Sequence, residues 1–172
     1  NDTTIKILQL KADPTKSSYW GQNAGLDLSD NDTFESLFGN LYQKMKYDVD
    51  ITVVTVPAYL AAYNSYVSTN DLTDGTVEAY TSFYNSYFSS YDMIMIGFRD
   101  LFDDFDSDGA TMALKLFIES GRSVMFAHDT TSFVSAHNSI YQHTSDHYWG
   151  YYLNRNIRSI VGMDRYGITE GE

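Results

Sequence analysis

Four short runs of apolar residues stand out along the chain, at residues 5–10, 51–56, 93–97 and 123–127. Runs of this length with little polar alternation predict buried β-strands, and they are typical of parallel strands that are covered on both faces. Lys6 and Gln9 interrupt the first run, so we expect both side chains to lie near a strand end or at an edge of the sheet.

Between these runs, apolar residues recur every three or four positions, which predicts amphipathic helices. Asp32 and Glu35 have the spacing of a capping box at the start of the first pattern, whose inner face comprises Phe34, Leu37, Phe38, Leu41 and Met45. Further patterns predict helices at about residues 59–67, 80–91, 107–120 and 152–161. The aromatic residues at 80–91 favour a helix packed on the sheet, with a sugar-binding platform as the alternative.

Strands that alternate with helices predict an α/β fold, and 172 residues are enough for one domain with a hydrophobic core. We therefore expect a single domain over residues 1–172, a three-layer, doubly wound fold with a mostly parallel sheet of the flavodoxin-like type. With the strands numbered along the chain, we predict the order 2-1-3-4 and an interior position for residues 93–97. The abrupt start and end lead us to expect a piece of a longer, multidomain protein.

Polar residues with catalytic or ligand-binding chemistry follow three of the predicted strands. They are Asp13 after the first, Arg99 and Asp100 after the third, and His128, Asp129, Thr130 and Thr131 after the fourth. Because the carboxyl ends of parallel strands meet at one edge of a sheet, we expect these side chains to flank a common crevice. His128 and Asp129 have the chemistry of a general base and a carboxylate partner, whereas the others suit a polar ligand. The alternative is that all of them cap helices and tie loops together.

Two motifs have the residue types of a metal site, and neither is complete. Residues 104–109 match the first half of a D-x-D-x-D-G calcium loop, but Lys115 stands where a bidentate glutamate is required. We therefore favour a helix start with Ser107 or Asp108 as the cap, and we predict no high-affinity calcium site. His143 and His147 have the spacing of a zinc pair without the glutamate of H-E-x-x-H, so we predict no zinc site and no cofactor.

Composition narrows the classes of partner. The net charge of −12 argues against nucleic acid and against anionic lipid. No apolar stretch approaches the length of a membrane helix, so we expect no membrane insertion. The chain has no cysteine, 15 tyrosines and only 11 lysines and arginines, a composition that favours a secreted or cell-surface protein.

A resemblance to a known family rests on three segments: YDMIMIGFRD at 91–100, FIESGRSVMFAHD at 117–129 and MDRYG at 163–167. They are similar to segments of an uncharacterised family, a domain of unknown function found in long, secreted or cell-surface proteins of Gram-positive bacteria. The resemblance implies an extracellular location and a fold like that of the class I glutamine amidotransferases and trehalose-utilisation-type proteins. Amidotransferases of that group need a nucleophilic cysteine, so their activity does not carry over to this chain.

The function that we expect from these observations is a non-catalytic or weakly catalytic module of an extracellular bacterial protein. It would bind a small polar molecule, such as a carbohydrate, in the crevice at the carboxyl ends of the strands. Two alternatives of other classes stay open: a hydrolase that uses His128 and Asp129, and a structural spacer domain without a binding site.

Overall fold

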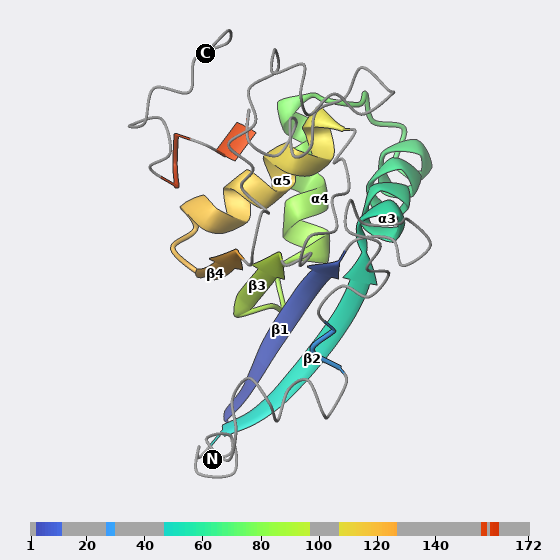
Figure 1. Cartoon of the computed structure of the whole chain (residues 1–172). Helices are drawn as coiled ribbons and strands as arrows, with labels where there is room; N and C mark the ends of the chain where they lie inside the picture. The colour runs from blue at the N-terminus through green and yellow to red at the C-terminus, as the bar shows by residue number, and fades with distance from the viewer. Residues whose placement is uncertain are drawn as a thin grey trace, which may run out of the picture.

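The computed structural model in Figure 1 describes residues 3–11, 27–29, 47–96, 107–126, 156–157 and 159–161. The strands in these ranges are β1 (Thr3–Lys11), β2 (Tyr47–Thr55), β3 (Met93–Ile96) and β4 (Ser123–Phe126). The helices are α3 (Val56–Thr69), α4 (Val77–Tyr87) and α5 (Asp108–Glu119). The helix predicted after Asp32 lies outside the described residues, and of the one predicted at 152–161 the structure describes a helical piece at Asn156 and Ile157.

The four strands form one parallel sheet in the order β2-β1-β3-β4. β3 pairs with β1 on one side and with β4 on the other, so the interior position predicted for residues 93–97 is confirmed for Met93–Ile96, the part that the structure describes. The α/β fold class, the parallel sheet and the strand order are confirmed as well. This order is that of flavodoxin-like, Rossmann-like three-layer folds.

β1 and β2 are much longer than the other two strands. β3 pairs only with Ile7–Leu10 of β1, so the first halves of β1 and β2 extend as a two-stranded ribbon beyond β3, as Figure 1 shows. Along β2, Asp48 and Asp50 are exposed while Val49 between them is half-buried. This alternation explains why the strand begins earlier than the continuous apolar run at 51–56 predicted.

Side chains alternate between the two faces of the sheet. One face, which we call the helix face, packs against α3, α4 and α5 through Leu8 and Leu10 of β1 and Ile94 and Ile96 of β3. The opposite face, which we call the reverse face, carries the alternate residues: Ile5, Ile7, Gln9, Val49, Ile51, Val53, Met93, Met95 and Met125.

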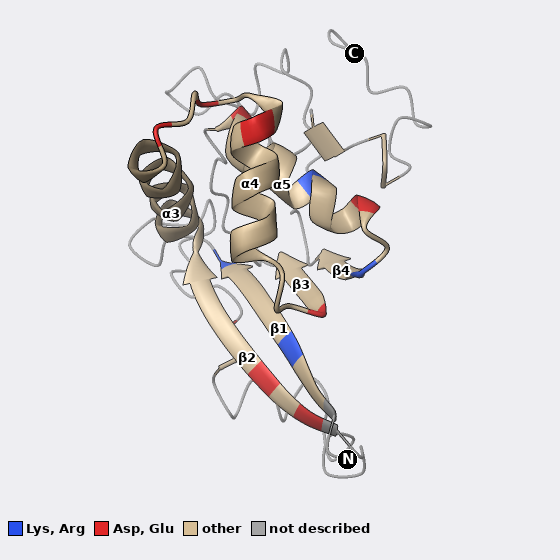
Figure 2. Ribbon diagram, turned by 180° about the vertical axis from the view of Figure 1, so that it is seen from behind, with Lys and Arg blue, Asp and Glu red and all other residues tan. Residues whose placement is uncertain are grey.

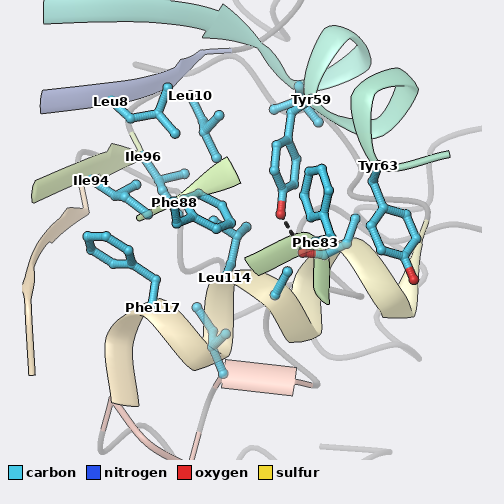
Figure 3. Close-up of a cluster of buried hydrophobic side chains, with 14 of the residues drawn as sticks. Leu8, Leu10, Tyr59, Tyr63, Phe83, Phe88, Ile94, Ile96, Leu114 and Phe117 are labelled. Atoms are coloured by element: carbon cyan, nitrogen blue, oxygen red, sulfur yellow. Dashed lines mark hydrogen bonds between the residues drawn. The ribbon is translucent and has the colours of Figure 1, made fainter. Parts of the chain in front are cut away.

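An aromatic cluster fills the space between the helix face and the three helices (Figure 3). Phe83 and Phe88 from the α4 segment are buried at its centre, with Phe83 contacting Tyr63 edge-on at 5.2 Å and Phe88 contacting Phe117 at 5.7 Å between ring centroids. The expectation that the aromatic residues at 80–91 pack on the sheet is therefore confirmed. Buried rings of this size supply much of the apolar burial that stabilises a domain.

A hydroxyl side chain caps each of the three helices. Thr55, Thr76 and Ser107 accept the backbone N–H three residues on, at 3.3, 3.3 and 3.1 Å. Side-chain oxygens at this position satisfy one of the unpaired N–H groups of the first helical turn. The cap predicted at Ser107 is confirmed, and α5 ends before Gly121 as the sequence indicated.

One expectation about these strands is met and one is wrong. Gln9 lies near the carboxyl end of β1, as expected, although this strand is interior and the side chain is fully buried. β4 was expected to be buried on both faces, but Ser123 and Met125 are exposed. The reason is position, because β4 is the outermost strand of the described sheet on its side.

Candidate functional site

The carboxyl ends of three strands lie side by side at one edge of the sheet. Leu10 of β1 is in register with Ile96 of β3, and Ile96 is in register with Phe126 of β4. Adjacent strands are about 4.8 Å apart, so these ends span about 10 Å. The connection that leaves β1 leads to β2 on one side, whereas the connection that leaves β3 leads to β4 on the other. The topological switch point, where open α/β sheets bind ligands, therefore lies between β1 and β3.

All seven predicted site residues follow within five residues of these strand ends, and all lie outside the described residues: Asp13, Arg99, Asp100, His128, Asp129, Thr130 and Thr131. The structure places the strand ends that precede these residues, and the crevice that they would form stays a prediction. The other motif residues outside the described ranges are Asp104, Asp106, His137, His143 and His147.

Gln9, near the carboxyl end of β1, is a polar residue that the sequence did not single out for this edge. Its side-chain carbonyl oxygen accepts the backbone N–H of Leu28 at 2.7 Å, and Leu28 is itself buried. A buried amide without partners costs about 1–3 kcal/mol, so this bond offsets the cost of placing Gln9 inside the sheet. The signal available in the sequence was one uncharged polar residue inside an apolar run.

Lys11 and Asp27 form an ion pair beside Gln9. The ammonium of Lys11 lies 2.7 Å from one carboxylate oxygen of Asp27, and the other oxygen accepts the backbone N–H and the hydroxyl of Ser29 at 2.9 and 2.6 Å. Burial raises the pKa of Asp27, but the bonds from Lys11 and Ser29 and the charge of Lys11 together lower the pKa below its ordinary value. Residues 27–29 are therefore held at the carboxyl end of β1, beside the switch point.

We expect Asp27→Asn to lower the free energy of unfolding by about 1 kcal/mol at pH 7, because the pair is only partly buried. Since the folded-state pKa of Asp27 is depressed, its contribution is present above the unfolded value of 3.8 and is lost as the pH falls through the folded value. Urea unfolding of both proteins between pH 3 and 7 measures the difference. The exposed Asp48→Asn on β2 is the control, and a difference that does not begin to shrink as the pH falls below 3.8 would contradict the ion-pair assignment.

The start of α5 distinguishes a calcium loop from a helix cap for the motif at residues 104–109, of which the structure describes residues 107–109. Asp108 and Gly109 belong to the first helical turn, and the carbonyl of Ala110 accepts the hydroxyl of Tyr59 at 2.6 Å. In a calcium loop these three positions would lie in the loop. The glycine would form a sharp turn, and the backbone carbonyl at the position of Ala110 would coordinate the ion. The Asp108 carboxylate instead accepts the side-chain N–H of Asn156 at 3.0 Å. These contacts favour the helix start.

Within the described ranges, no group of three or more acidic or histidine side chains is placed to hold a metal ion. None of the helices in that part of the chain combines the length and the apolar composition that crossing a membrane requires. Comparisons with protein-family models, with curated proteins and with solved structures return no match.

Proposed function

We propose that this domain is a module of an extracellular bacterial protein that binds a small polar ligand, such as a carbohydrate, at the switch point between β1 and β3. The observation that carries the proposal is the parallel sheet with the order β2-β1-β3-β4. In sheets of this kind the connections on either side of the switch point run to opposite faces, and the ligand enters the space between them.

The residues that follow the strand ends have the chemistry that such a ligand needs. Arg99 presents a fork of N–H donors, and Asp13 and Asp100 present carboxylate acceptors, which is the combination that pairs with adjacent hydroxyl groups. The extracellular location is supported by composition, since the chain has no cysteine and is rich in tyrosine.

The test is a glycan array with the whole chain, followed by titration of any glycan that binds. Arg99→Ala and Asp100→Asn are expected to weaken binding by tenfold or more, because each lost charged hydrogen bond is worth about 1.5–3 kcal/mol. Lys6→Ala and Asp50→Asn are matched controls, since they remove the same charges from the ribbon at the opposite end of the sheet. These controls should bind like the parent chain.

Two outcomes count against the proposal. If neither the array nor a panel of small polar metabolites gives a ligand that Arg99→Ala weakens, the structural-spacer alternative is favoured. If a bound glycan is cleaved, and His128→Ala abolishes cleavage while binding persists, the domain is a hydrolase that uses His128 as a general base and Asp129 as its partner.

A further inference from the structure

The ribbon formed by the first halves of β1 and β2 projects beyond β3, away from the three helices and from the switch point (Figure 1). β2 is its outer strand, and within the described residues no further strand pairs with the side of β2 that faces away from β1. A ribbon of only two strands is marginally stable in water. An additional strand along this side, which we call the outer edge of β2, would therefore stabilise the ribbon.

The backbone groups of β2 alternate between β1 and the outer edge. Lys6 of β1 faces β3, since its N–H donates to the Asp92 carboxylate and its carbonyl accepts the Asp92 N–H, both at 2.8 Å. The next residue, Ile7, therefore faces β2, and it bonds to the two neighbours of its register partner Ile51. Ile51 itself then points its N–H and carbonyl away from β1. By the same alternation, the outward-facing positions of β2 are Val49, Ile51 and Val53.

The side chains of β2 give this edge an alternating chemistry. Asp48 and Asp50 are exposed on the helix face, and Figure 2 shows the acidic residues of β2 in the projecting part of the strand. Val49 and Ile51 alternate with them on the reverse face and are half-buried. Side chains of a strand added here would therefore lie in turn beside a carboxylate and beside an apolar group. Opposite charges on neighbouring strands favour pairing, and like charges oppose it.

We propose that the outer edge of β2 binds an extended segment of a partner protein in which lysine or arginine alternates with apolar residues. The outward N–H and carbonyl groups of β2 pair with the backbone of this segment. Its basic side chains lie beside Asp48 and Asp50, and its apolar side chains lie beside Val49 and Ile51. In recognition of this kind, main-chain hydrogen bonds supply affinity and alternate side chains supply selectivity.

A second copy of the chain is a poorer occupant of this edge. If two ribbons paired about a two-fold axis near Val49, Asp48 of one copy would lie opposite Asp50 of the other, and like charges in this position destabilise a pair of strands. The net charge of −12 also repels another copy, whereas it attracts a basic partner. Charge complementarity therefore favours a basic segment.

The probe for this edge is a short, end-blocked peptide of alternating lysine and valine, fluorescently labelled and titrated with the whole chain. We expect Asp48→Asn combined with Asp50→Asn to weaken binding about tenfold, because both cross-strand charge pairs are lost. The control combines Asp71→Asn with Glu78→Gln, at exposed positions after α3 and at the start of α4. It removes the same charge and should bind like the parent chain.

Peptide controls separate strand pairing from general attraction between opposite charges. A peptide of the same composition, with its lysines and valines in separate blocks, should bind about tenfold more weakly. N-methylation of alternate residues, made in both phases, should abolish binding in one phase only, since one phase removes the N–H groups that face β2. On binding, the N–H of Ile51 should become protected from hydrogen exchange.

Three results would overturn the proposal: no binding of the alternating peptide, equal binding of the alternating and block peptides, or no new protection at Ile51. A free chain that is dimeric, with the N–H of Ile51 already protected, would assign the edge to a second copy instead. Because Asp48 and Asp50 are exposed, the paired variant should stay folded, and circular dichroism checks this.

Discussion

Gly109→Ala is expected to destabilise the protein by about 2–3 kcal/mol, although alanine is the better helix former by about 1 kcal/mol at an exposed helical position. A Cβ atom on Gly109 would overlap the hydroxyl and the ring of Tyr63 in α3. Tyr63 is fully buried and packs edge-on against Phe83. Its ring therefore has no space to move away, and the strain falls on the contact between α3 and α5.

Urea unfolding, followed by circular dichroism, measures this loss. Gly75→Ala is an instructive comparison, because Gly75 has a positive φ of 73° and nothing within 4 Å of its missing Cβ, so only the conformational cost of about 1 kcal/mol applies. In a Tyr63→Leu background, Gly109→Ala should cost much less than in the parent chain. Parent-like stability of Gly109→Ala would contradict the predicted clash.

Gly109 also shows where sequence patterns stop being informative. The run from Asp104 to Gly109 is compatible with half a calcium loop and with the start of a helix. The contacts that separate the two interpretations come from Tyr59 and Tyr63, on a helix far away in the sequence. A local motif does not contain such a long-range contact. In the sequence, the helix start was favoured because Lys115 stands where a calcium loop requires a glutamate.

The fold was more accessible to prediction than the site. Strand order follows from alternating elements and from the handedness of crossovers, which are general properties of the chain. Burial of individual residues depends on which neighbours cover them, and this is why the expectation for β4 was wrong and why the sequence did not predict the full burial of Gln9. The site residues were chosen from their places after the strands, and the register of Leu10, Ile96 and Phe126 supports the choice of edge without testing the side chains.

Arg122 illustrates a stabilising residue that carried no signal in the sequence, since a single arginine before a strand has no characteristic pattern. Its guanidinium donates to the carbonyl oxygens of Phe88 and Tyr91 at 2.7 and 2.9 Å and to the hydroxyl of Tyr84 at 2.5 Å. It also lies 4.1 Å from the centroid of the Phe117 ring. Arg122 belongs to the short connection that joins α5 to β4, and Figure 2 shows this connection. One side chain thus joins the end of α4, the start of β3 and α5.

We expect Arg122→Ala to lower the free energy of unfolding by about 2–4 kcal/mol, because the partly buried carbonyl at the end of α4 would lose its charged donor and Phe117 would lose its cation–π contact. Arg122→Lys should recover less than half of the loss, since an ammonium cannot reproduce the planar fork. Lys115→Ala is the control: its contact with Glu119 is long, at 3.8 Å, and should be worth less than about 0.5 kcal/mol. Because the carbonyl partners of Arg122 are uncharged, its effect should persist in 1 M salt, where surface ion pairs are screened. A loss for Arg122→Ala no larger than that for Lys115→Ala would contradict the predicted contribution. A loss that lysine fully restores would show that charge alone matters at this position.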